Sequence, residues 1–92
     1  SPVQTAYLQA ETRKADERFV ADVARITASP VALVRRAMPR EGRITDPAVR
    51  VIAAIEAQRH IVVSPEQKAL ISSAEQQRRS AIANARAAAR QR

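Results

Sequence analysis

The chain has 92 residues, a formal net charge of +7 and no cysteine, and 46% of its residues are hydrophobic. This length limits it to one modest domain, and the lack of cysteine excludes disulfides and thiolate metal sites. The positive charge favours an anionic partner, with nucleic acid first and acidic proteins or lipid headgroups as alternatives. No apolar run is long enough for a membrane span or a signal peptide, so we expect a cytoplasmic protein of bacterial or phage origin.

The composition predicts an all-α fold. Twenty residues are alanine, one is glycine, and the aromatic residues are Tyr7 and Phe19. Alanine is the strongest helix former, whereas short hairpin turns favour glycine. We therefore expect a helix-turn-helix-like three-helix core with a long N-terminal helix within residues 1–63. An Arg-rich C-terminal helix should follow within residues 64–92.

The first predicted helix runs from about Thr5 to Ile26, after a short lead over residues 1–4. Acidic and basic residues balance over residues 1–26, so this helix should add little attraction for a polyanion. We expect it to pack on the rest of the chain or on a second copy. Steps of three and four residues place one set of side chains on a single face: Leu8, Thr12, Ala15, Phe19, Val23 and Ile26.

Two further helix starts are predicted by the pairs Ser29-Pro30 and Asp46-Pro47. Each pair places a side-chain oxygen at an N-cap and a proline at the first helical position. Because Pro39 disfavours helical backbone in the residue before it, the helix opened by Ser29 should end after about two turns. A long helix, a tight turn, a short helix, a loop and another helix form the order of a helix-turn-helix module.

Each helix of this module has one apolar face at the spacing i, i+3, i+4, i+7, which we expect to point inward. In the short helix this face consists of Pro30, Leu33, Val34 and Ala37. In the next helix it consists of Ala48, Val51, Ile52 and Ile55. These faces should close around Phe19, Val20 and Val23, which leaves an outward face of Val31, Ala32, Arg35 and Arg36.

The run Ser64-Pro65-Glu66-Gln67 is a capping box and predicts a long helix from Pro65 to near Ala89. The apolar stripe of this helix is sparse: Ile71, Ala74, Ile82, Ala85 and Ala89. Its second half has no acid after Glu75 and contains Arg78, Arg79, Arg86, Arg90 and Arg92. We expect its end to fray unless a partner is bound.

Catalysis finds little support in the sequence. The chain has one histidine, and a single glycine cannot form a glycine-rich phosphate loop. Glu56 and His60 are four residues apart and share a helix face, but a metal site needs at least a third ligand. We therefore expect no enzymatic activity, no cofactor and no metal ion.

Duplex DNA is the partner that the sequence favours most. Outward arginines on a short helix can grip phosphate or donate two parallel hydrogen bonds to a guanine edge, while small apolar side chains can touch a thymine methyl. Arg25 and Arg50 flank the module and are placed to reach phosphate. The candidate DNA-binding residues are Ser29, Val31, Ala32, Arg35, Arg36, Arg40, Arg43, Arg78, Arg79 and Arg86.

Between residues 19 and 60 the chain resembles the headpiece of the lactose-repressor family. The matching runs are Asp22-Val23-Ala24-Arg25, Ser29, Leu33-Val34-Arg35-Arg36-Ala37, Gly42-Arg43-Ile44-Thr45 and Val51-Ile52-Ala53-Ala54-Ile55-Glu56. The resemblance implies a helix-turn-helix module in which Ser29 contacts phosphate and Pro30, Val31 and Arg35 occupy base-reading positions.

The sequence departs from that family's pattern in three places. The turn Thr27-Ala28 is one residue short and lacks the family's glycine. Proline and valine replace polar base readers, which leaves Arg35 as the one reader capable of bidentate contacts. The Arg-rich helix from Pro65 onward stands where a hinge and a sugar-binding domain would follow.

Two other interpretations remain open. In the first, the chain is a structural or assembly subunit whose long helices pack on copies of the chain or on a larger partner in a virion, secretion or conjugation assembly. Alanine-rich helices with few large residues suit such close packing. In the second, the C-terminal helix lies on a membrane surface, which ranks last because its apolar stripe lacks Trp, Phe and Leu anchors.

Overall fold

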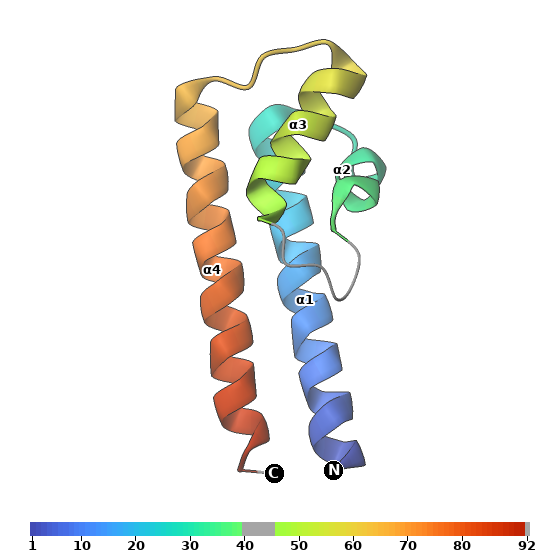
Figure 1. The fold of residues 1–92 in the computed structure, drawn as a ribbon, viewed down its shortest axis with the longest axis vertical. Helices are drawn as coiled ribbons and strands as arrows, with labels where there is room; N and C mark the ends of the chain where they lie inside the picture. The colour runs from blue at the N-terminus through green and yellow to red at the C-terminus, as the bar shows by residue number, and fades with distance from the viewer. Residues whose placement is uncertain (40–45, 92) are drawn as a thin grey trace.

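A computed structural model describes residues 1–39 and 46–91, and these residues form four α-helices (Figure 1). The helices are α1 (Pro2–Thr27), α2 (Val31–Ala37), α3 (Pro47–Arg59) and α4 (Pro65–Ala89). The long α1 and α4 run antiparallel side by side, with both chain ends at one end and α2 and α3 at the other (Figure 1). The expected all-α class with long first and last helices is confirmed.

Serine and aspartate caps before prolines fix three of these helix starts. Asp46 accepts a hydrogen bond from the Ala48 backbone N–H, and Ser64 forms the expected capping box with Gln67. An equivalent box formed by Ser1 and Gln4 opens α1 at Pro2. The prediction of a short lead over residues 1–4 before the first helix was therefore wrong, because this segment carries the same capping signature as the start of α4.

The prediction of Ser29 as the N-cap of the short helix was also wrong. α1 continues to Thr27, so Ser29 lies in the turn between α1 and α2. Its side chain is buried in this turn. Extended backbone at Pro30 precedes α2 without a side-chain cap, and the Leu33 N–H donates to the Pro30 carbonyl oxygen at 3.1 Å. Pro30 itself is exposed rather than inward-facing.

One hydrophobic cluster joins all four helices. Its fully buried side chains are Phe19, Val20, Val23, Val34, Val51, Ile55, Val63 and Ile71. The inward positions expected in α3 contribute to it, with Ile52 half-buried at its edge. Residues from both predicted segments, 1–63 and 64–92, pack in this cluster, so α4 is part of the fold's core.

Beyond α2 and α3, the two long helices continue as a pair. Small side chains such as Ala15, Ala85 and Ala89 are buried along this part, with Leu8 and Ile82 half-buried beside them. Alanine permits a close approach of two helices but buries little area for each residue. This part of the molecule therefore gains less from apolar burial than the end that holds α2 and α3.

Among the described residues, no helix combines the length and the apolar character needed to cross a membrane.

We predict that Ser64→Ala lowers the free energy of unfolding by about 1 kcal/mol, because it leaves the Gln67 N–H of α4 without its cap. Ser72→Ala, at an exposed position in the same helix, is the matched control and should change stability by less than about 0.5 kcal/mol. Urea denaturation followed by circular dichroism measures both. Equal effects of the two substitutions would contradict the role of the cap.

Candidate nucleic-acid interface

The outer face of α2 has the arrangement expected from the sequence. Leu33 and Val34 are buried against the core, whereas Val31, Ala32, Arg35 and Arg36 are exposed. Because α2 is anchored on one side only, its arginines project away from the hydrophobic cluster. We call the face formed by Val31, Ala32, Arg35 and Arg36 the α2 face.

The two arginines of the α2 face differ in their surroundings. The Arg35 Nε donates to both carboxylate oxygens of Glu17 in α1, at 3.0 and 3.3 Å, and both side chains are about half exposed. Such an exposed pair contributes only about 0 to 1 kcal/mol, so exchanging Glu17 for a DNA phosphate costs little. Arg36 is exposed and forms no ion pair with any other described residue.

The turn that leads into α2 is built without glycine. Ala28 adopts the left-handed conformation, with φ of 52° and ψ of 41°. The N–H of Ser29 donates to the carbonyl oxygen of Ala24, and the N–H of Ala28 donates to that of Arg25, which is the Schellman pattern of a helix end. The left-handed residue is thus an alanine, at a cost of about 1 to 2 kcal/mol.

An arginine that the sequence analysis did not select holds this turn. Arg59, in the last turn of α3, donates through one nitrogen to the carbonyl oxygens of Ala28 (2.7 Å) and Thr27 (3.3 Å) and to the Ser29 hydroxyl (3.1 Å). These bonds tie the end of α3 to the start of α2. The sequence offered no signal for them, because a basic residue in the last turn of a helix normally interacts with that helix's own carbonyl groups.

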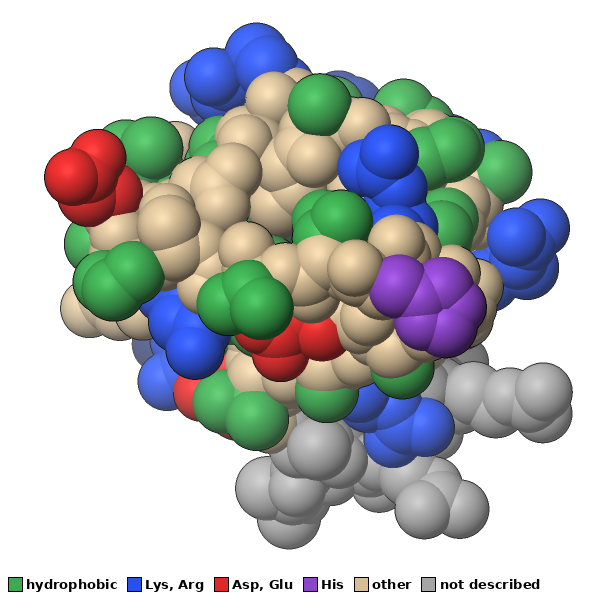
Figure 2. All heavy atoms as spheres, turned by 90° about the horizontal axis from the view of Figure 1, so that it is seen from above, with side chains coloured by type: hydrophobic (Ala, Val, Ile, Leu, Met, Phe, Trp, Pro, Cys, Tyr) green, Lys and Arg blue, Asp and Glu red, His purple; other side chains and the backbone are tan. Residues whose placement is uncertain are grey.

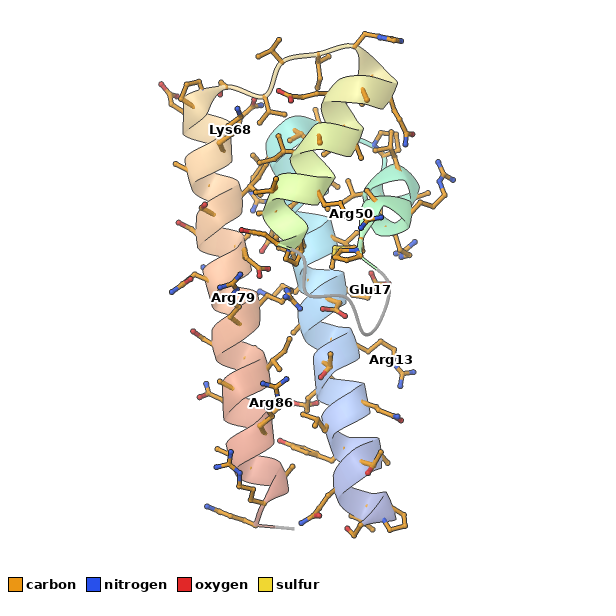
Figure 3. The ribbon with its side chains drawn as sticks, in the orientation of Figure 1. Arg13, Glu17, Arg50, Lys68, Arg79 and Arg86 are labelled. Atoms are coloured by element: carbon orange, nitrogen blue, oxygen red, sulfur yellow. The ribbon has the colours of Figure 1, made fainter. Side chains whose placement is uncertain are left out.

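The predicted arginines of α4 are not equivalent. Arg78 lies between the long helices, with its side chain 18% exposed, and binds Asp16 at 3.0 Å and Glu75 at 2.7 Å. This placement leaves Arg78 little surface for a partner. Arg79 also binds Glu75, at 2.8 Å, but stays mostly exposed, and Arg86 is exposed (Figure 3).

The predicted contacts Arg40 and Arg43 lie outside the described residues, as does Arg92. Of the flanking arginines, Arg50 is exposed on α3, while Arg25 is exposed and paired with Asp22 at 3.4 Å. Of these arginines, Arg25 lies in α1, Arg50 in α3, and Arg79 and Arg86 in α4.

The buried carboxylate of Glu75 is the most perturbed acid in the described structure. Burial raises its pKa, but hydrogen bonds from Arg78 and Arg79 outweigh that effect and hold the pKa below the ordinary value of 4.5. The hydrogen bond to Glu75 likewise raises the pKa of Arg78. Glu75 is therefore ionised at neutral pH.

Glu56 and His60, which the sequence analysis considered as two possible metal ligands, lie near the end of α3. A Glu56 carboxylate oxygen accepts a hydrogen bond from the Val63 N–H at 3.0 Å, and His60 ends α3 in the left-handed conformation. Among the described residues, no three His, Cys, Asp or Glu side chains gather as metal ligands would.

The end of the molecule that carries the α3–α4 link has no concentrated charge. Seen from above, basic side chains are spread around its rim, with hydrophobic and acidic side chains between them (Figure 2). This end is therefore a weaker candidate for a polyanion than the α2 face.

Comparison of the chain with protein-family models, with curated proteins and with solved structures found no match.

We predict that Glu75→Gln lowers the free energy of unfolding at pH 7 by about 1.5 to 3 kcal/mol, because it weakens three hydrogen bonds from two charged partners, Arg78 and Arg79. The folded-state pKa lies below 4.5, so the wild-type advantage is complete above that pH and is lost as the pH falls through the folded-state pKa.

Thermal unfolding at pH 7 and at successively lower pH measures this difference. Glu66→Gln, at an exposed position of α4, is the control and should remain close to the wild type at pH 7. A Glu75→Gln variant as stable as the wild type at pH 7 would show that the network does not hold the long helices together.

Proposed function

We propose that the protein binds duplex DNA by placing the α2 face in the major groove. The observation that carries this proposal is the exposure of Arg35 and Arg36 on a short helix whose opposite side is buried through Leu33 and Val34. The major groove is about 12 Å wide and admits one α-helix. A helix of seven residues is about 10 Å long, which allows contact with a few base pairs.

The arginines and the valine of the α2 face then have different roles. Arg35 and Arg36 donate to guanine edges or to phosphates, and Val31 offers an apolar surface to a thymine methyl. The pairing of Arg35 with Glu17 restricts that arginine before DNA is bound. It also leaves a carboxylate near the DNA, which penalises poorly fitted contacts and favours selective ones.

Sequence-independent attraction comes from the excess of positive charge. The chain's net charge of +7 draws DNA from solution, and exposed arginines near the α2 end of the fold, such as Arg50 of α3, neutralise phosphates. Within a cell this binding serves a transcriptional regulator or an accessory factor of a nucleoprotein complex. The affinity should then fall with salt, with a log–log slope of about −0.9 for each phosphate neutralised.

We predict that Arg35→Ala weakens binding to a selected duplex by roughly 1 to 3 kcal/mol and relaxes the preference at one base pair. Arg18→Ala, which removes the same charge from an exposed position of α1, is the control. The duplex is selected from a random library with the wild-type protein, and fluorescence anisotropy gives the affinities at two salt concentrations. Equal losses of affinity for both variants, with unchanged selectivity, would show that net charge alone accounts for binding. That result would refute base recognition by the α2 face.

A second candidate function is that of an assembly subunit acting through helix packing. One specific observation favours it: the exposed face of α4 includes Leu70, which is 56% exposed, and uncharged side chains at Ser73, Gln77, Ser80, Ala81 and Asn84. These residues line shallow hollows beside Arg18 and Asp22 of α1. Small side chains of this kind allow another helix to approach closely.

The mass of the protein in solution separates the two candidates. For the DNA-binding protein, we expect light scattering to show a monomer that gains mass when a duplex is added, with the gain lost at high salt. A defined oligomer whose mass does not respond to duplex DNA at low salt would favour the assembly subunit and contradict the first proposal.

A further inference from the structure

The exposed basic residues of α4 and of its C-cap, Arg90, lie on one side of the helix. At 3.6 residues per turn, Lys68, Arg79, Arg86 and Arg90 fall on one narrow line along its length, since they are spaced by 11, 7 and 4 residues. All four are exposed, and Arg79 alone among them forms an ion pair with another described residue. We call these four residues the basic stripe.

The rest of the exposed surface of α4 has no charge from Ala69 to Ala88. It consists of small or amide side chains such as Ser73, Gln76, Gln77, Ser80, Ala83 and Asn84. The alignment of these basic side chains on one line suits a linear array of negative charges.

The length of the basic stripe fits a duplex. From Lys68 to Arg90 the helix rises about 33 Å, which is close to one turn of B-DNA at 34–36 Å. Arg86 and Arg90, one helical turn apart, form the densest part, next to the paired Arg79. Side chains of this type contact phosphates without reading bases.

The basic stripe and the α2 face lie on different parts of the molecule. α2 packs on α1 and α3, and α4 packs on the same two helices without touching α2 (Figure 1). Glu17 of α1 binds Arg35 of the α2 face (Figure 3), and Asp16 of α1 binds Arg78 of α4. A single duplex laid over both surfaces would have to cross α1 or α3, which separate α2 from α4.

We infer that the basic stripe of α4 holds a second segment of duplex DNA, so that one chain bridges two duplexes. This inference rests on the proposed DNA binding by the α2 face. The α2 face selects one segment, and the basic stripe holds another by its phosphates, independently of sequence. The chain thereby brings two DNA segments together, as an accessory factor of a nucleoprotein complex would.

A two-duplex capture assay tests this inference. A duplex selected by the wild-type protein is immobilised, protein is bound to it, and a fluorescent duplex of unrelated sequence is added at low salt. We expect the wild type to capture the second duplex. Arg86→Gln combined with Arg90→Gln should lower that capture at least tenfold while binding to the immobilised duplex stays within about twofold, because neither residue belongs to the α2 face.

The control combines Arg13→Gln with Arg18→Gln, which removes the same charge from exposed positions of α1 and should keep the capture. Sedimentation of the complex counts the chains, and one chain for each pair of duplexes is expected. The inference is overturned if the wild type binds the immobilised duplex but captures no second one, if the two double variants behave alike, or if two chains join the two duplexes. The proposed DNA binding by the α2 face is tested separately. Unchanged binding of the Arg35→Ala variant to the immobilised duplex would refute it.

Discussion

The guanidinium of Arg78 is the polar link on which the frame of the molecule depends. It joins Glu75 of its own helix to Asp16 of α1, and Glu75 is 5% exposed. The contact with Asp16 crosses between the two helices and is partly exposed, with the Asp16 side chain 39% exposed, and it favours the observed register of α1 against α4. With α1 fixed in this way, Phe19, Val20 and Val23 are presented to α2 and α3, and the hydrophobic cluster can close.

The orientation of α2 depends in turn on polar contacts at its start. Seven residues cannot form a stable helix alone, so α2 relies on burial of Leu33 and Val34 and on the turn before it. Arg59 fixes that turn by binding three oxygens of residues 27–29. The α2 face is therefore held by the folded core, as a helix that enters a DNA groove requires.

Much of the fold was predictable because its signals are local. A cap followed by proline determines where α3 and α4 begin, and apolar spacing identified the buried faces around Val51 and Ile71. The same pattern, a cap residue before proline, gave a wrong prediction at Ser29. Because α1 extends to Thr27, Ser29 lies in the turn after α1 and does not cap α2. The site was harder to predict, because the partners of Arg59 and Arg78 come from distant parts of the chain and appear only after folding.

We propose that duplex DNA binds at the α2 face, which this frame positions. An NMR titration of the labelled protein with a selected duplex tests this proposal. We expect the largest amide shifts on residues 31–36 and on the nearby Glu17, followed by smaller shifts along Lys68, Arg79, Arg86 and Arg90. Shifts confined to the uncharged surface of α4 around Gln77, with residues 31–36 unchanged, would contradict it.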